Sequence, residues 1–343
     1  MGSFQVQGSA GTKMPEPIAT RRVGDILKKI PRKIGSASES IRRVFRYAFK
    51  VLAGRPIRIF CESNWRLGDE IMMFPCYEAL KKKYPGSVLS VKTHYPELLA
   101  LIPHVDEVNP PTDVCDLYLC LRGGEKGVER RATLERRIGC SFSSQPIRIE
   151  PDMKALPPEV KDKRGLRFVF FHTASQPCKR WPRERFRTLS SWLLTFPDSE
   201  VIEVGRDVEP LGIGTNLIGR TTPVELAAVL RSADLFIGND SGPLHLALAV
   251  GTPAVGLFGS TEPDLLFPPL DRFFPVKARS VCRGCWSKEE MAYPGGVCPR
   301  DCLECMESIA ASDVEEAVKK ALAWGSLDSV NQNEKQECNR HHE

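Results

Sequence analysis

The chain lacks any long hydrophobic run, although it has 343 residues of which 42% are hydrophobic. No apolar stretch approaches the roughly 20 residues that a helix needs to cross a bilayer. The first 25 residues hold Gly, Ser, Thr and Pro without an apolar core, so we expect no secretory signal. These absences predict a soluble cytoplasmic protein. The length of the chain is sufficient for two domains with full cores.

A large excess of one charge is also missing, since 48 Lys and Arg against 43 Asp and Glu give a net charge of +5. Residues 21–55 hold 11 Lys and Arg against 2 acids, a local +9, so the rest of the chain is about −4. This distribution argues against a general nucleic-acid-binding surface. Cysteine, by contrast, is abundant at 12 residues. Without a secretory signal, reduced thiols or metal ligands are expected rather than disulfides.

The basic segment carries the pattern of an amphipathic helix within residues 38–55. Its apolar residues recur at helical spacing: Ile41, Val44, Phe45, Ala48, Phe49 and Leu52. The other face is mostly cationic: Arg42, Arg43, Arg46 and Lys50. One interpretation is peripheral contact with the anionic inner face of the cytoplasmic membrane. The alternative is a helix that packs on the first domain and leaves its basic face solvated.

From residue 57 onward, strand and helix patterns alternate twice, which predicts an α/β protein with two parallel, doubly wound, Rossmann-like domains. The first set comprises strands at 57–61, 88–92 and 116–121 and helices at 69–84, 95–102 and 125–138. A proline-bearing linker is predicted at 151–164. The second set comprises strands at 167–171 and 200–204, helices at 183–195, 223–231 and 312–324, and the motif described next.

Residues 233–263, ADLFIGNDSGPLHLALAVGTPAVGLFGSTEP, predict strand, polar turn, helix, turn and strand. Gly238 to Gly242 are turn residues, Pro243 suits a first helical turn, and Gly251 suits a helix end. A helix that begins after a strand presents backbone N–H groups at the carboxyl edge of a sheet. That arrangement is typical of a diphosphate site, whereas a generic βαβ turn with a packed histidine is the plainer interpretation.

This string resembles the donor-site signature of glycosyltransferase family 9, the ADP-heptose:lipopolysaccharide heptosyltransferases, which have the two-domain GT-B fold. The resemblance implies an N-terminal acceptor domain at 56–155, after the basic tail and helix at 1–55. It implies a C-terminal nucleotide-sugar donor domain at 165–311, which includes a cysteine-rich finger at 282–305. A C-terminal helix at 312–325 and a disordered tail at 326–343 would complete the chain.

The first motif for chemistry is Ser63 to Asp69, SNWRLGD, which resembles the N-terminal motif of the family. The resemblance implies that Asp69 is the catalytic base. A carboxylate in a cleft can take the proton of a sugar hydroxyl as that hydroxyl attacks the donor. The simpler interpretation is that Asp69 caps a helix.

The resemblance also implies a set of donor-binding residues: Thr173, Ser175, Lys179, Glu209, Asp240, Ser241, Gly242 and His245. Lys179 lies in a Lys-x-Trp-Pro motif, and a fixed cation there would neutralise the leaving diphosphate without a catalytic metal. Lys179 and Arg180 are otherwise expected to be exposed loop charges. Glu203, Gly205, Arg206 and Glu209 lie where relatives hold residues near the nucleoside, and Glu209 is the weakest of these assignments.

A cysteine-rich finger supplies five candidate metal ligands: Cys282, Cys285, Cys298, Cys302 and Cys305. Spacing alone selects two Cys-x2-Cys pairs separated by 16 residues, which omits Cys298. The resemblance instead implies a set with Cys298 and without Cys302. Structural Zn or Fe, or reduced thiols without metal, are the alternatives.

Together these motifs predict an inverting glycosyltransferase that moves a heptose from ADP-heptose to a lipopolysaccharide-core or related glycan. The alternatives are a protein acceptor, as in autotransporter heptosyltransferases, a nucleotide-sugar epimerase, or a binder of nucleotide-sugars that has lost catalysis. No cofactor is expected to be required for catalysis.

Overall fold

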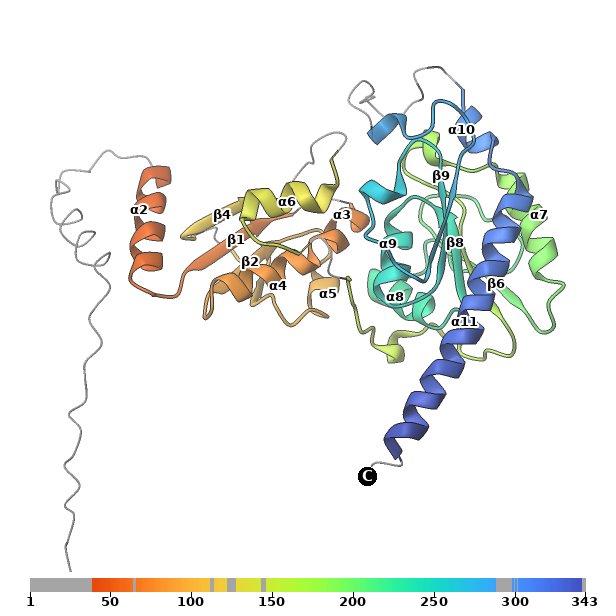
Figure 1. The fold of residues 1–343 in the computed structure, drawn as a ribbon, viewed down its shortest axis with the longest axis horizontal. Coiled ribbons are helices and arrows are strands. Elements are labelled where there is room, and N and C mark those ends of the chain that lie inside the picture. The colour runs from red at the N-terminus through yellow and green to blue at the C-terminus, as the bar shows by residue number, and fades with distance from the viewer. Residues whose placement is uncertain are drawn as a thin grey trace, which may run out of the picture.

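The computed structural model describes residues 39–63, 66–111, 114–121, 128–142, 146–287, 298, 300 and 302–340, with side chains given only as far as 326 at the C-terminal end. Two α/β domains lie side by side, each built on a parallel sheet (Figure 1). The predicted fold class is confirmed. None of the described helices is both long enough and apolar enough to span a membrane.

The N-terminal domain has a four-stranded sheet in the order β3-β2-β1-β4, in which every pairing is parallel. Its strands are β1 (Arg58–Glu62), β2 (Val88–Lys92), β3 (Glu107–Val108) and β4 (Leu117–Cys120). Its helices are α2 (Glu39–Leu52), α3 (Leu67–Met72), α4 (Phe74–Lys83), α5 (Pro96–Leu99) and α6 (Arg130–Ile138). The predicted helix at 69–84 is divided at Met73, because Pro75 in the first turn of α4 cannot continue the ladder of α3.

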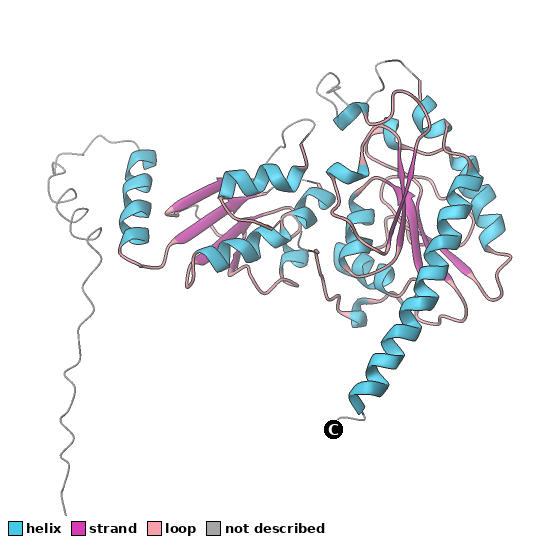
Figure 2. Ribbon diagram, viewed as in Figure 1, coloured by secondary structure: helices cyan, strands magenta, loops and turns pink. Residues whose placement is uncertain are grey.

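The C-terminal domain has a six-stranded parallel sheet in the order β10-β9-β8-β5-β6-β7. Its strands are β5 (Arg167–Phe171), β6 (Glu200–Glu203), β7 (Thr215–Asn216), β8 (Leu235–Asn239), β9 (Ala254–Phe258) and β10 (Phe273–Lys277). Its helices are α7 (Arg183–Leu193), α8 (Pro223–Arg231), α9 (Gly242–Ala249), α10 (Glu304–Glu307) and α11 (Ala311–Arg340). Helices cover the sheet (Figure 2), and β5, β8 and β9 are buried throughout.

Helix α11 is longer than the sequence predicts. It runs to Arg340, whereas a helix at 312–325 and a disordered tail were expected. The extension contains no proline, and its Glu, Lys and Gln residues favour helix even though they offer little to a core.

The domains meet where α3 packs on α9. A Cβ atom on Gly242 would lie 2.8 Å from the Leu67 Cβ, and one on Gly68 would lie 2.9 Å from the His245 ring. Only glycine allows so close an approach at these two positions. The chain crosses between the sheets near the same helix, where the backbone N–H of Ile149 donates to the Ala249 carbonyl at 2.9 Å.

Helix α2 is confirmed as a helix, but it docks by its cationic face. Lys50 Nζ lies 2.7 Å and Arg46 Nε 2.9 Å from the carboxylate of Asp116, which is buried. Phe45 and Phe49 on the apolar face remain exposed. The alternative of a packed helix with a solvated basic face is therefore wrong, because the buried Asp116 carboxylate recruits both cations.

Candidate active site

The strand orders locate the site before any side chain is considered. In the C-terminal sheet the order reverses between β5 and β8, which are direct neighbours. Ligands of doubly wound sheets bind at the carboxyl ends of the strands at such a reversal. The residues after β5 and β8 are the Thr173–Lys179 loop and the Asp240–Gly242 turn, which are the two predicted donor motifs.

The turn after β8 forms the predicted helix start. α9 begins at Gly242 with Ser241 as its N-cap and proline in the first turn. The Ser241 hydroxyl donates to the carbonyl of Asn239 at 2.9 Å and makes no side-chain cap. The positive end of α9 therefore lies at the edge of the sheet beside the Asp240 side chain.

Lys179 and Asp240 form an ion pair at the centre of this edge, with Nζ 2.6 Å from Oδ2. Thr261 also donates to the Asp240 carboxylate at 2.8 Å. Burial opposes the ionisation of Asp240, but Lys179, His245 and Thr261 together lower its pKa below the ordinary value. Lys179 is only 17% exposed, so the alternative of an exposed loop charge is wrong for this residue, although Arg180 is exposed.

Asn239 joins the two donor motifs, a role that the sequence did not reveal. Its side chain donates to the carbonyl of Thr173 at 3.2 Å and accepts from the backbone N–H of Trp181 at 3.1 Å. Both contacts are long-range, and no spacing rule indicates them. The loop before α7 is thereby fixed to the end of β8, with Ser175 at its exposed crest.

His245 lies in the first turn of α9 and is 6% exposed. Its ring stacks on Phe267, with centroids 4.3 Å apart, and also packs against Gly68 of the N-terminal domain. It acts electrostatically on Asp240. The predicted group of Lys179, Asp240, Ser241, Gly242 and His245 is therefore assembled around the start of α9.

The N-terminal motif reaches the same edge from the other domain. Arg66 is the N-cap of α3, and its guanidinium donates to the Ser175 hydroxyl at 2.7 Å. Asp69 is the third residue of α3 and is half-buried, so the prediction that it caps the helix is wrong. The motif that holds the predicted base thus bonds directly to the predicted donor loop.

Glu70, which the sequence did not single out, is fully buried beside Asp69. Its carboxylate accepts hydrogen bonds from the hydroxyls of Ser63, Thr93 and Tyr77, the last at 3.1 Å. Burial raises the pKa of Glu70, and these hydroxyls only partly offset the effect. The side chain fastens α3 to the ends of β1 and β2 and so sets the orientation of the half-buried Asp69.

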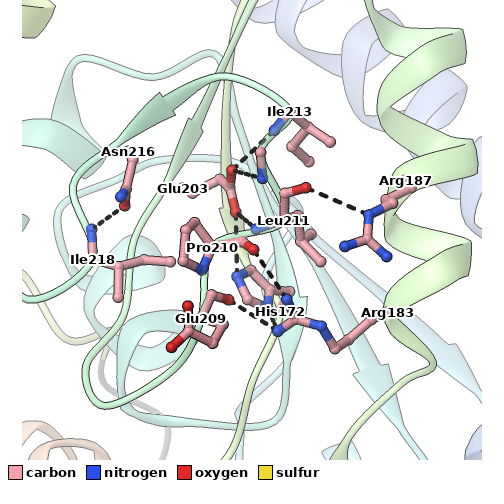
Figure 3. A network of polar contacts seen from close by, with 11 residues as sticks. His172, Arg183, Arg187, Glu203, Glu209, Pro210, Leu211, Ile213, Asn216 and Ile218 are labelled. Carbon is pink, nitrogen blue, oxygen red and sulfur yellow. Dashed lines mark hydrogen bonds and ion pairs between the residues drawn. The ribbon is translucent and has the colours of Figure 1, made fainter.

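Among the described residues, no contact joins Glu209 to the group around the start of α9. Its side chain is exposed, and its backbone carbonyl accepts from Arg183 at 3.0 Å. The buried acid of this region is Glu203, which holds the loop from within (Figure 3). Strand patterning could have identified Glu203, since an acid on the inner face of a buried strand needs buried partners.

The cysteine-rich finger is described only in part, because residues 288–297, 299 and 301 lie outside the described residues. Burial raises the pKa of the Cys305 thiol to about 12, and Cys282, Cys285 and Cys298 act on it in the same direction. Cys302 is not among these neighbours. In the described part of the chain, no three His, Cys, Asp or Glu residues are grouped closely enough to hold a metal ion.

Comparison with known proteins agrees with this geometry. Residues 150–292 match the family model of Glycosyltransferase family 9 (heptosyltransferase). The inactive autotransporter heptosyltransferase BimC from Burkholderia thailandensis is 23% identical over 309 residues, which cover 81% of this chain and 71% of BimC. Lipopolysaccharide heptosyltransferase 3 from Escherichia coli K12 is 38% identical over 103 residues, which cover 26% of this chain and 30% of that protein.

Two solved structures share the fold. The iron-containing dodecameric glycosyltransferase TibC from enterotoxigenic E. coli has a TM-score of 0.67 at 18% identity, covering 78% of this chain and 76% of TibC. ADP-heptose lps heptosyltransferase II from E. coli has a TM-score of 0.57 at 15% identity, covering 78% of this chain and 98% of that protein.

The two parallel sheets and these structural neighbours show a GT-B-like fold, in which the two Rossmann-like domains meet through α3 and α9. Residues 150–292 carry the match to glycosyltransferase family 9, and the rest of the chain lies outside that match. The local matches to lipopolysaccharide heptosyltransferases span about 30% of those proteins, so donor, acceptor and mechanism are treated below as proposals.

Proposed function

We propose that this protein transfers a heptose from ADP-heptose to a lipopolysaccharide-core or related glycan, with inversion of configuration. The observation that carries the proposal is the Lys179–Asp240 ion pair at the start of α9, on the opposite side of the α3–α9 contact from the helix that carries Asp69. Cation and base are thereby held on opposite domains, as a displacement between two bound substrates requires.

The donor diphosphate would lie at the start of α9. Backbone N–H groups and the helix dipole there favour an anion, and Lys179, although paired with Asp240, places its ammonium group at the same edge of the sheet. Asp240 orients the lysine, because its own charge is retained by the low pKa. As the bond to the sugar breaks, Lys179 and His245 would stabilise the charge that develops on the leaving diphosphate.

The acceptor hydroxyl would be deprotonated by Asp69 as its oxygen attacks the anomeric carbon. The carbon–oxygen bond to the diphosphate breaks in the same step, and the electron pair leaves with the nucleotide. Gly68 and Gly242 allow α3 to approach α9 closely, which excludes water from the reacting centre. The proposal is tested by binding of ADP, UDP and GDP to the wild type: preferential ADP binding supports it, and no binding of any of the three contradicts it.

Protein acceptors are the second candidate, because BimC and the structural neighbour TibC point toward that branch. BimC is named as inactive, so the experiment must also test whether this chain has lost catalysis. ADP release from ADP-heptose would be compared with lipopolysaccharide-core oligosaccharide, with an autotransporter passenger domain, and with neither. The acceptor that accelerates release identifies the branch, whereas ADP binding without release under any condition indicates a nucleotide-sugar binder.

The family resemblance implies Cys282, Cys285, Cys298 and Cys305 as ligands of a structural metal, although the described part of the chain does not group three such side chains closely enough to hold an ion. Four thiolates suit Zn or Fe and leave no open coordination position, so the ion would crosslink the finger. TibC is described as iron-containing. Metal content of anaerobically purified protein, compared between Cys298→Ser and Cys302→Ser, tests the assignment: loss in the first variant only supports it.

Helix α2 is proposed to contact an anionic membrane surface through its outward face. Val44 is 65% exposed, Phe45 44% and Leu52 47%, and the sequence before the helix is strongly basic. Sedimentation with anionic vesicles should fall for Phe45→Ser and remain unchanged for Val281→Ser, which alters an apolar residue that is 95% exposed elsewhere. Equal sedimentation of both variants and the wild type would contradict the contact.

A further inference from the structure

A buried polar network lies under the loop that follows β6, outside the group around α9 (Figure 3). Glu203 is the last residue of β6 and is fully buried. One carboxylate oxygen accepts the backbone N–H groups of Gly212 at 3.0 Å and Ile213 at 3.1 Å, and the other accepts that of Leu211 at 2.5 Å. A single side chain therefore closes the loop of residues 204–213.

The same carboxylate faces the residue that follows β5. His172 Nε2 lies 3.3 Å from Oε2 of Glu203, in polar contact although the alignment for a hydrogen bond is poor. Burial opposes the ionisation of Glu203, but His172 and the backbone N–H groups of Leu211 and Ile213 lower its pKa below the ordinary value. The acceptor is therefore charged, which strengthens each of its hydrogen bonds.

Arg183 holds the outer side of the loop. Its guanidinium donates to the carbonyls of Glu209 at 3.0 Å and Pro210 at 3.1 Å. It also lies 3.5 Å from His172 Nδ1. Because a guanidinium only donates, Nδ1 accepts in that contact, and a neutral ring then carries its proton on Nε2, toward Glu203. The loop is thus fastened to β5, β6 and α7 together.

In the proposed donor pose, the nucleoside extends from the diphosphate toward this loop. β6 pairs with β5, so the loop after β6 borders the Thr173–Lys179 loop at the same edge of the sheet. Its tip also approaches the other domain. Burial raises the pKa of Tyr95, and this rise is opposed by the charge of Arg206 and by a hydrogen bond with the backbone of Leu67 in α3.

We propose that Glu203 and Arg183 are positioning residues that hold the loop of residues 204–213 in the shape that binds the nucleoside of the donor. The inference rests on the proposed nucleotide-sugar function and goes beyond it by assigning residues that need not touch the ligand. Glutamine cannot replace Glu203, because each carboxylate oxygen faces at least two donors and an amide NH2 group would oppose one of those pairs.

The test uses the full chain with ADP as the probe. Glu203→Gln is expected to weaken ADP binding by about tenfold or more in calorimetry, as expected when a buried charged acceptor is lost. Limited trypsin digestion provides a second measurement, because Arg206 lies in the loop and its side chain is 83% exposed. Cleavage after Arg206 should accelerate in the variant, and ADP should protect the wild type more than the variant.

Glu200→Gln is the matched control. Glu200 lies on the same strand and pairs with Arg167 at 2.7 Å, away from the loop. The Glu200→Gln variant should leave ADP affinity and cleavage after Arg206 unchanged, even if the protein is less stable. In turnover, Glu203→Gln should raise the donor KM and leave kcat close to the wild-type value, a split that a general folding defect does not produce.

Wild-type ADP affinity in Glu203→Gln, with or without faster cleavage, would overturn the inference while leaving the proposed function intact. Absence of ADP binding by the wild type would instead overturn the proposed function, and the inference with it. If Glu203→Gln does not fold, Arg183→Lys provides the same comparison, since lysine cannot donate to both loop carbonyls in the fork geometry of arginine. Unchanged affinity in that variant would also overturn the inference.

Discussion

The two domains share one strand order around their first strand, yet they treat a buried carboxylate in opposite ways. In the C-terminal domain Asp240 faces a lysine, and its pKa is lowered. In the N-terminal domain the Glu70 carboxylate accepts from three hydroxyls of the described residues, and burial raises its pKa although these hydroxyls and His94 lower it. The same arrangement of strands therefore holds the Lys179–Asp240 ion pair in the C-terminal domain. In the N-terminal domain it holds Glu70, a carboxyl group with a raised pKa.

This difference separates the tasks of the two domains. The C-terminal domain retains a fixed positive end, formed by Lys179 and α9, which suits a diphosphate that gains charge. The N-terminal domain buries Glu70 as an anchor and leaves its neighbour Asp69 half-buried, as the proposed role of a base requires. Asp69 and Glu70 are adjacent acids of α3, and their positions on the helix, rather than their residue types, decide which one is accessible to a substrate.

The largest expected effect is at Asp69. Asp69→Asn keeps the size of the side chain but removes the base, so transfer should fall by about 10²–10⁴-fold, the usual contribution of a positioned general base. ADP affinity should stay within about twofold of the wild type, because the proposed donor site lies on the other domain. Transfer at the wild-type rate would show that the base lies elsewhere.

The next effect concerns the contact between the domains. In Gly242→Ala the new Cβ would lie 2.8 Å from the Leu67 Cβ, so α3 and α9 must separate. Misplacement of a reacting group by about 1 Å costs about 100-fold in rate, and we expect a loss of transfer of that order. Gly325→Ala, where a Cβ would meet nothing within 4 Å, is the control and should retain full activity.

Lys179→Met tests the charged side of the comparison. Loss of one charge-assisted hydrogen bond should weaken ADP binding by about 10–100-fold, equivalent to about 1.5–3 kcal/mol. Arg180→Met removes the adjacent, exposed cation and should change ADP binding far less. Equal effects of the two substitutions in calorimetry would indicate general electrostatic attraction rather than a site.

The smallest effect is the pH dependence of stability. Because the pKa of Asp240 is lowered from about 3.8, the stability it contributes is present above that pH and is lost as the pH falls through its folded value. Because the pKa of Glu70 is raised from about 4.5, the folded state loses stability as the pH rises above that value.

Urea unfolding of two variants at a series of pH values checks these opposite signs. Relative to the wild type, Asp240→Asn should be most destabilised near neutral pH, and Glu70→Gln should become relatively more stable as the pH rises. Slopes of the same sign for the two variants would show that the two carboxylates do not differ as described.

Local sequence patterns predicted much of this fold. The ranges of β2, β5 and α8 were predicted without error, since apolar runs and a proline at the first turn define them. The short edge strands β3 and β7 were not predicted, because two residues carry no periodicity. The division between α3 and α4 was missed although Pro75 could have indicated it.

The candidate site was predictable where motifs follow strands, as for Lys179 and Asp240. The residues that hold these motifs and loops in position were not predictable from the sequence. Asn239, Glu70 and the pairing of Glu203 with His172 depend on contacts between segments that are distant along the chain, which no local pattern encodes. The sequence left the orientation of α2 open between two interpretations, because that orientation depends on the distant Asp116.

The most direct test of the account is ADP release from ADP-heptose, measured for the wild type and Asp69→Asn with and without acceptor. The account predicts release by the wild type that accelerates with one acceptor class, and bound but unreacted ADP-heptose in Asp69→Asn. Release that is equal in the two proteins, or wild-type protein that binds ADP-heptose and never releases ADP with any acceptor, would contradict a base on α3 acting on a donor held at α9.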